Sequence, residues 1–545
     1  MTVTDLKIST LSVAVQANWN RRRMVARPPL FLAVAAVVVA LLALLPLGYL
    51  VLRASEAGLD KVLDILLRPR THEIFLGSAG LALAVTAASV VLGVGLAWLT
   101  VRTDLPGRKV WAILTVLPLV IPSYVGAFAL VSALGPKGLL QGLLAPLGVE
   151  RLPSIYGFWG AFLALTLFTY PYMLLSVRAA LRGLDPSLEE AARSLGRSPW
   201  RVFREITLPH LRPSIVAGGL LVSLYTLSDF GAVSMLRFDS FTRAIYMQYS
   251  ASLDRSVAAV LALLLVGLTL VILVGEQKMR GKARYYRSSS GTVRPAAPVK
   301  LGKWRWPALA FCSAVVLLAL VMPLGVIVYW LARGIGTGQA LSLQPGVVFN
   351  SVAASGGAAL LAIVAAIPIT VLAIRFPGRV SRWLERSTYI GYALPGIVIA
   401  LALVFFGANF ATVLYQTIFL LLFAYVVRFL PQAIGSTRSS LLQVSPRLEE
   451  ASRNLGRSPL QTLATVTVPL VRPGLLTGLA LVFLTAMKEL PATLLLGPTG
   501  FSTMATRIWD YTAEAFFAQA SVPALLLVLV SAVAVWLILS QEEKK

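Results

Sequence analysis

The chain has 545 residues, of which 57% are hydrophobic and only 13% are charged, and its formal net charge is +25. The single cysteine, Cys312, excludes an intramolecular disulfide and a thiolate cluster, and two histidines, His72 and His210, leave little material for a histidine metal site or catalytic triad. The apolar residues come in runs of about 20 or more, the length of a helix that crosses a bilayer's hydrocarbon core. We therefore expect an all-α, polytopic membrane protein.

Windows of apolar residues predict six helices in each half of the chain. They fall at roughly 29–52, 74–101, 110–134, 156–180, 214–236 and 256–275, and again at roughly 306–332, 349–374, 387–410, 412–430, 474–497 and 520–540. About 12 transmembrane helices are thus expected, in two homologous six-helix domains at 29–277 and 306–541. Residues 1–28 are expected to form an N-terminal tail. Residues 278–305, rich in Lys, Arg, Ser, Gly and Pro, are expected to form a solvated linker.

The basic residues lie between the apolar runs and, counted along the predicted helices, always on the same side of the membrane. Segments with a basic excess are 21–27, 102–109, 178–212, 278–305, 375–386, 428–472 and 544–545. Loops on the other side, such as 53–73 and 334–350, show no such excess. By the positive-inside rule, both termini are predicted to be cytoplasmic. This topology accounts for the net charge, so nucleic acid is not an expected partner.

Two polar segments between apolar runs, 185–213 and 445–473, are near copies of each other, and we call them the first and the second island. They read DPSLEEAARSLGRSPWRVFREITLPHLRP and SPRLEEASRNLGRSPLQTLATVTVPLVRP. Each predicts a short helix with Asp185 or Ser445 as its N-cap and a glycine as its stop, followed by a second short helix that ends at Pro209 or Pro469. Such a repeat indicates a docking element that the chain uses twice, and it argues against a catalytic site.

The islands resemble the EAA loop of permease subunits of ATP-binding-cassette (ABC) importers. Three parts of the first island carry the resemblance: Glu190-Ala191-Ala192, Gly196, and Ile206 to Pro209. The second island departs mildly, at Ser452 and Val466. The resemblance covers nearly the whole chain as two fused permease units, and it implies the MetI-like fold of type I importer permeases. In that family the loop docks on an ATPase subunit, which implies coupling roles for Glu190, Ala191, Ala192, Gly196, Glu450, Ala451 and Gly456.

The resemblance also implies the partners of the chain. No Gly-x-x-x-x-Gly-Lys-Ser/Thr phosphate loop occurs in the sequence, so ATP and Mg are expected on a separate subunit. Two ABC ATPase subunits, one on each island, and a soluble substrate-binding protein on the outer face are the expected partners, in a bacterial inner membrane. The chain itself is expected to be a transport subunit and not an enzyme, with no cofactor and no metal site.

Three further stretches, which begin at Ser123, Ser228 and Lys488, are similar to fused permeases that import ferric iron. The same importer class carries thiamine, polyamines, sulfate or phosphonates, and these cargoes remain alternatives. A gradient-driven secondary transporter, which also uses duplicated helical halves, is the alternative from a different class. The two EAA-like islands and the scarcity of acids within the predicted spans argue against it.

Ionisable residues within predicted spans mark a candidate pathway or gate. Asp229 and Glu489 occupy matching positions in the fifth and eleventh spans, beside Tyr225 and Lys488. Ferric iron is a hard cation that prefers carboxylate and phenolate oxygen, which suits these residues. The alternative is that Asp229, Lys488 and Glu489 pair with each other or with other helices and fix the packing. Tyr124 is expected to be a packing or interface residue.

Overall fold

The computed structural model describes residues 28–184, 186–251, 256–280, 298–339 and 344–542, and this part of the chain is built almost wholly of helices. Eleven helices are long and apolar enough to cross a membrane, and the shorter apolar helix Gly396–Phe410 lies within the remaining predicted span. The expected all-α membrane protein is thereby confirmed. Residues 1–27 of the predicted tail, the predicted N-cap Asp185 and residues 281–297 of the predicted linker lie outside the described residues.

The first half contains a long second helix, two broken spans and the first island. Its elements are α2 Leu30–Ser55, α3 Leu59–Leu67, α4 Pro69–Arg102, α5 Arg108–Leu114, a 3-10 turn Leu117–Val120, α6 Ser123–Leu134, α7 Leu139–Leu144, a 3-10 turn Ala145–Leu147, α8 Phe158–Gly183, α9 Pro186–Ser194, α10 Pro199–Val202, a π-helical turn Phe203–Thr207, α11 Leu208–Ser228, α12 Gly231–Met235, α13 Phe241–Ala251 and α14 Ser256–Arg280.

From Pro345 onward the second half repeats the order that begins at α4, without counterparts of α7 and the 3-10 turn that follows it. Its elements are a 3-10 turn Gly302–Trp304, α15 Arg305–Val316, a π-helical turn Leu317–Val321, α16 Met322–Gly336, α17 Pro345–Arg375, α18 Arg379–Thr388, α19 Ile390–Ala393, α20 Gly396–Phe410, α21 Ile418–Leu441, α22 Pro446–Asn454, α23 Pro459–Thr462, a π-helical turn Leu463–Thr467, α24 Val468–Met487, α25 Pro491–Leu496, α26 Met504–Ala513 and α27 Phe517–Glu542.

Four of the predicted spans are broken where the apolar pattern predicts continuous helix. The third and the ninth are interrupted just before α6 and α20, at Pro122 and Pro395. The fifth and the eleventh stop at Ser228 and Met487 and resume as the short helices α12 and α25. Proline lacks a backbone donor and clashes with the preceding turn, which accounts for the first two breaks. Hydropathy alone does not register any of the four, because both sides of each break are apolar.

The tenth span lies further along the chain than predicted. Helix α21 begins at Ile418 and ends at Leu441, whereas 412–430 was expected. The hydroxyl and amide side chains that follow residue 430 lower the hydropathy without stopping the helix, because neighbouring helices and a cavity receive them. Arg428 therefore lies inside a membrane helix and not at the start of a basic loop.

The second helix of each island continues into the membrane, so the prediction that it ends at Pro209 or Pro469 is wrong. A π-helical turn, Phe203–Thr207 or Leu463–Thr467, ends two residues before the proline, and α11 or α24 continues from it. A π turn is wider than an α turn, and it accommodates the proline ring and its missing donor without ending the helix. Each island is thus joined without a loop to the membrane helix that follows it.

The first membrane helix of each half packs against the other half. Helix α2 lies along α17 and α20, where the Tyr49 hydroxyl donates to the Phe405 carbonyl at 3.2 Å. Helix α16 lies along α6, where Trp330 Nε1 donates to Ser132 Oγ at 2.5 Å. This exchange of helices joins the two halves into one body.

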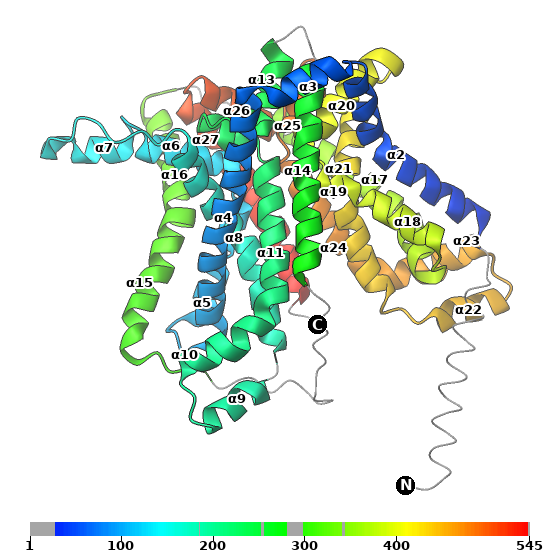
Figure 1. Ribbon diagram of the computed structural model, residues 1–545, viewed down its shortest axis with the longest axis horizontal. Helices are drawn as coiled ribbons and strands as arrows, with labels where there is room; N and C mark the ends of the chain where they lie inside the picture. The colour runs from blue at the N-terminus through cyan, green and yellow to red at the C-terminus, as the bar shows by residue number, and fades with distance from the viewer. Residues whose placement is uncertain (1–27, 185, 252–255, 281–297, 340–343, 543–545) are drawn as a thin grey trace.

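Both islands lie on one side of the helical bundle, along the lower edge of Figure 1, with α9 and α10 to the left and α22 and α23 to the right. We call this the island side. Helices α3 and α13 mark the opposite side, at the upper edge of the figure. The predicted N-cap Ser445 makes no side-chain cap bond, whereas Ser458 forms a reciprocal capping box with Gln461 at the start of α23.

A buried ion pair holds the first island against the end of α4. Glu189 is only 6% exposed, and its Oε1 lies 3.6 Å from Nη2 of Arg102, the last residue of α4. Thr207, which ends the π turn, donates to the same carboxylate at 2.8 Å. The glutamate therefore connects three segments: the short helix α9, the long helix α4 and the start of α11.

The second island repeats this anchor with closer contacts. Glu449 is 5% exposed, and Nε of Arg375, the last residue of α17, donates to its two carboxylate oxygens at 3.1 and 3.0 Å. Arg375 Nη2 also donates to the Val444 carbonyl at 3.1 Å, and Thr467 Oγ1 donates to Glu449 at 3.1 Å. Because the charges are buried and mutually satisfied, removing either partner leaves a costly unpaired charge.

Replacing Glu449→Gln should loosen the second island, because breaking a buried ion pair costs about 3–5 kcal/mol. We expect trypsin to cleave after Arg453 in α22 at least about tenfold faster than in the unaltered protein, since about 1.4 kcal/mol of local opening corresponds to tenfold. Limited proteolysis of the purified protein in detergent, followed by mass spectrometry, measures this rate. The matched control is Glu450→Gln, one residue along and exposed. Equal cleavage of the two variants would contradict the anchoring role.

Candidate functional site

Each island presents an exposed surface around its glycine. Gly196 and Gly456 have φ angles of +79° and +85°, a left-handed conformation that glycine adopts without strain, and they turn the chain between the two short helices. No heavy atom lies within 4 Å of a Cβ placed on either glycine, so the turn is open to a partner. The predicted docking residues that are exposed on this surface are Glu190, Ala191, Gly196, Glu450, Ala451 and Gly456.

Ala192 differs from the other predicted docking residues because it is buried, at 6% exposure. Its counterpart Ser452 is equally buried, and the Ser452 hydroxyl lies 3.1 Å from that of Thr462, inside the island. The third position of the motif therefore packs beneath the docking helix and does not present a surface. The serine in the second island keeps this packing by adding one internal hydrogen bond.

The islands also expose large apolar side chains that the sequence reasoning did not single out. Leu195 and Leu455, each directly before the turn glycine, are 82% and 84% exposed. Trp200 and Leu460 are exposed at the start of the next helix in each island. The sequence signal that could have identified these exposed side chains was an apolar residue beside a glycine within a polar segment. Clustered apolar side chains within a charged surface are typical of a protein interface.

A cavity of about 1190 Å³ lies between the two halves. Its wall is formed mainly by α11, α21 and α24 together with the segments around Pro122 and Leu394. All four predicted pathway residues line it, and the structure thereby brings together Tyr225, Asp229, Lys488 and Glu489 from separate halves. The cavity begins on the island side near Pro469 and Arg472, at the start of α24.

The two acids stand at matching helix breaks and cap the short helices that follow. Asp229 Oδ1 accepts from the backbone N–H groups of Ala232 and Val233 at 2.9 and 3.3 Å, at the start of α12. Glu489 Oε1 accepts from the Ala492 N–H at 3.3 Å, at the start of α25. A carboxylate is stabilised at a helix N-terminus by unpaired N–H groups, which explains acids inside an apolar bundle.

The partners of the charged side chains differ between the halves. Asp229 accepts a short hydrogen bond from Ser123, the first residue of α6. Glu489 instead forms an ion pair with Arg428 at 3.0 Å. Lys488 Nζ donates to the Leu119 carbonyl of the first half at 2.8 Å. Asp229, Lys488 and Glu489 do not pair with each other among the described contacts, but each has a partner on another segment, as the alternative of pairing with other helices predicts.

Gly396 makes room for this ion pair. It begins α20 directly after Pro395, as Ser123 begins α6 directly after Pro122. A Cβ on Gly396 would lie 1.4 Å from Nη1 of Arg428 and 2.5 Å from Oε1 of Glu489. The guanidinium of Arg428 thus occupies the space that a side chain at position 396 would need.

Tyr124 and Arg428 are two cavity residues whose position the sequence reasoning did not foresee. Tyr124 is 3% exposed and lines the cavity, and within the described chain its hydroxyl has no hydrogen-bond partner. Tyr124 belongs to the buried core, which agrees with the packing expected for it, and its buried hydroxyl is costly unless water or a ligand satisfies it. For Arg428 the signal was a cation inside an apolar run, which a shifted helix boundary concealed.

The cavity ends beneath a layer of apolar side chains. Phe230 and Leu490, each directly after a capping acid, line its far end. Phe230 packs against Tyr246 and Trp509, with ring centroids 4.8 and 5.1 Å apart, and neither of these rings lines the cavity. The cavity is therefore closed toward the opposite side of the bundle.

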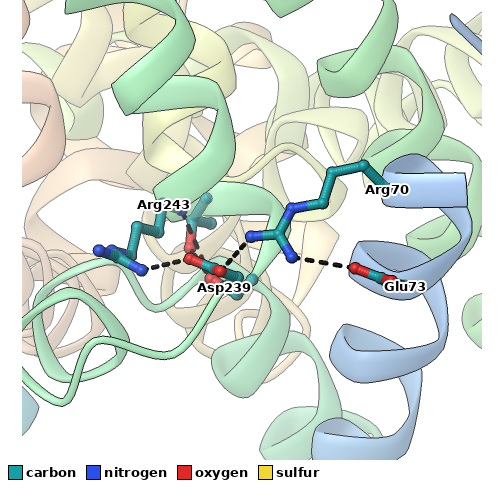
Figure 2. A network of polar contacts seen from close by, with 6 residues as sticks. Arg70, Glu73, Asp239 and Arg243 are labelled. Carbon is teal, nitrogen blue, oxygen red and sulfur yellow. Dashed lines mark hydrogen bonds and ion pairs between the residues drawn. The ribbon is translucent and has the colours of Figure 1, made fainter. Parts of the chain in front are cut away.

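On that opposite side, exposed charges join α4 to the segment before α13. Figure 2 shows Arg70 between Glu73 and Asp239, with Arg243 on the other side of Asp239. The Arg70–Glu73 pair has a distance of 3.0 Å, and both side chains are more than half exposed. Solvent screening makes such pairs weak contributors to stability, so this network mainly shapes the charge of the surface.

The chain matches the family model described as "Binding-protein-dependent transport system inner membrane component" over residues 89–277 and again over 343–543. It is 36% identical to the Fe(3+)-transport system permease protein FbpB 2 of Haemophilus influenzae over 516 residues, which cover 94% of this chain and 98% of that protein. It is 26% identical to the ferric transport system permease protein FbpB of Actinobacillus pleuropneumoniae, over 75% of this chain and 62% of that protein.

A relative named for a different cargo matches a smaller share of this chain. The molybdenum transport system permease protein ModB of Escherichia coli is 37% identical over 174 residues, which cover 31% of this chain and 72% of that protein. The two separate matches to the family model coincide with the two helical halves and include both islands. The chain therefore belongs to the permeases of binding-protein-dependent ABC transport systems and contains the permease unit twice.

Proposed function

We propose that this chain forms the complete translocation pathway of an ATP-driven importer of ferric iron. The observation that carries the proposal is the 36% identity to a permease named for Fe(3+) transport along 94% of this chain. Relatives named for molybdenum cover 42% and 31% of it, and one named for sulfate covers 39%. Membership in a binding-protein-dependent family favours ATP over an ion gradient as the energy source. Thiamine, polyamine and phosphonate are the alternative cargoes, and identifying the ligand of the binding protein would distinguish them from ferric iron.

The island side is the cytoplasmic side in this proposal, with both termini in the cytoplasm of a bacterial cell. The basic segments between the helices support this orientation by the positive-inside rule. Two ABC ATPase subunits dock there, one on each island, and hold the ATP and Mg. The chain itself binds no cofactor and catalyses no reaction. Exposed leucines beside the turn glycines, together with Glu190 and Glu450, provide an apolar contact with a charged rim.

The opposite side receives the substrate-binding protein. The exposed network of Arg70, Glu73, Asp239 and Arg243 offers charges of both signs there, which favours a protein partner with complementary charges (Figure 2). The cavity extends from Pro469 and Arg472 at the island end to Phe230 and Leu490 at its far end, which supports an inward-facing state. Closure of the ATPases would move the islands and open the far end.

The acids at the two helix breaks form the proposed passage for the cation. Asp229, Tyr225 and the unpaired hydroxyl of Tyr124 supply hard oxygen ligands on the first-half side of the cavity. Glu489 is neutralised by Arg428, and Lys488 links the halves through the Leu119 carbonyl. We assign a cargo contact to the first group and a gate to Lys488 and Glu489, because the gate contacts must exchange partners when the halves move.

Replacing both turn glycines with valine, Gly196→Val with Gly456→Val, should uncouple ATP hydrolysis from transport. A left-handed residue other than glycine costs about 1–2 kcal/mol, so each turn would relax to another shape and displace the docking helix. Iron uptake by proteoliposomes that contain the complete importer should fall at least about tenfold, since 1.4 kcal/mol corresponds to tenfold. The matched control is asparagine at both positions, because asparagine tolerates this conformation. Unchanged uptake in the valine variant would rule out the coupling role.

Replacing Asp229→Asn should reduce transport without disturbing the docking of the ATPases. The amide oxygen keeps an acceptor for the α12 cap, and the amide N–H can donate to the Ser123 hydroxyl, but the charge that attracts a cation is lost. We expect uptake of radioactive iron to fall by about tenfold, which corresponds to 1.4 kcal/mol, with ATP hydrolysis stimulated as in the unaltered importer. Asp510→Asn, a carboxylate that does not line the cavity, is the control. Wild-type uptake in the Asp229→Asn importer would exclude a cargo contact at this residue.

A further inference from the structure

The two halves can be compared residue by residue around the cavity. From α8 to the end of α11, each position corresponds to the position 260 residues further on, because Glu449 follows Glu189 and Glu489 follows Asp229 at this same interval. Pro171 in α8 and Pro431 in α21 agree with the correspondence. Helix α8 thus corresponds to α21, and α11 to α24. Where two corresponding residues that line the cavity differ, the two halves present different side chains to the cavity.

One pair of corresponding positions has opposite chemistry. In the first half, Tyr172 of α8 packs against Tyr225 of α11, with ring centroids 5.6 Å apart. In the second half, the same positions are Gln432 of α21 and Thr485 of α24, and the Thr485 hydroxyl donates to the Gln432 side-chain oxygen at 3.0 Å. All four residues line the cavity. An aromatic contact on one wall therefore faces an amide–hydroxyl contact on the other.

The polar wall continues along α21 toward the island side. Ser436 and Ser440 follow Gln432 at intervals of four residues, so the three lie on one face of the helix over about 12 Å. All three line the cavity, and Arg472 lies at its island end. Their counterparts Ser176 and Ala180 on α8 are not among the described residues that line it. The second half thus carries three polar residues on one face of α21 that line the cavity, whereas of their counterparts on α8 only Tyr172 lines it.

We infer that this row on α21, with Thr485 of α24, is the path along which the cargo leaves the level of Asp229 and Glu489 for the island side. The inference rests on the proposed function and specifies the cargo chemistry as a hard, hydrated cation. A cation that loses water needs oxygen ligands in its place, and hydroxyl and amide oxygens spaced by one helical turn supply them in succession. The Ser436 hydroxyl donates to the Gln432 carbonyl at 3.1 Å, and its oxygen keeps lone pairs for a ligand.

The complete importer in proteoliposomes, with its ATPases and the binding protein loaded with ferric iron, tests the path. The double variant Gln432→Leu with Ser436→Ala should lower iron uptake per ATP hydrolysed at least about tenfold, the effect of 1.4 kcal/mol on the barrier. Ser176→Ala is the matched control: Ser176 Oγ donates to the carbonyl four residues earlier, as Ser436 Oγ does, but lies outside the cavity wall. Uptake within twofold of wild type in the double variant, or an equal loss in both, would overturn the inference.

A second measurement does not depend on the cargo. In a Cys312→Ser background, which removes the single cysteine, Ser436→Cys and Ser440→Cys should react with a charged, membrane-impermeant thiol reagent added from the island side. Ser176→Cys and Ala180→Cys should react at least about tenfold more slowly, because neither position lines the cavity through which the reagent enters. Equal rates in both helices would overturn the polar path. If the labelling differs as expected but the wild-type importer carries no ferric iron, the path stands and the proposed cargo is wrong.

Discussion

The structure depends on one interaction that occurs twice: a buried glutamate of the island paired with the arginine that ends the second long helix of its half. Glu189 with Arg102, and Glu449 with Arg375, bind the islands to helices that cross the whole bundle. A buried charge pair tolerates little displacement, because separation leaves both charges in a medium of low polarity. Any force applied to an island must therefore move the long helix with it.

The same glutamates also fix the starting points of α11 and α24 through the threonines that end the π turns. From there α11 extends over 21 residues, about 30 Å, and stops at Asp229, while α24 extends over 20 residues and stops just before Lys488 and Glu489. The exposed surfaces of the islands and the acids at the cavity's far end are thus at opposite ends of the same helices. A small rotation of an island becomes a displacement of a capping acid, without any flexible segment between them.

Much of this architecture follows from the sequence, because long apolar runs, a repeated polar segment and paired glycines leave physical signatures. The island glycines were predicted correctly as turns, and their φ angles explain why glycine stands there. Which of two adjacent glutamates is buried was not predictable, since Glu189 and Glu190 differ only in the face of α9 that they occupy. The same limit applied to the predicted helix end at Pro209. A π turn is a response to packing, and the local sequence composition does not predict it. Arg428 was misplaced for the related reason that hydropathy cannot distinguish a basic loop from a helix whose polar side meets a cavity.

Duplication followed by fusion explains why the scaffold is symmetric and the cavity is not. In a dimer of identical units, two positions related by the symmetry axis would have to carry the same residue. Here Ser123 donates a hydrogen bond to Asp229. Gly396, at the matching position, instead leaves the space that the Arg428 guanidinium needs to reach Glu489. Gly396 and Arg428 are interdependent. A side chain at 396 would displace Arg428, and without Arg428 the buried Glu489 would lose its countercharge. Because this chain encodes each half separately, Glu489 can be paired with an arginine while Asp229 is paired with a serine.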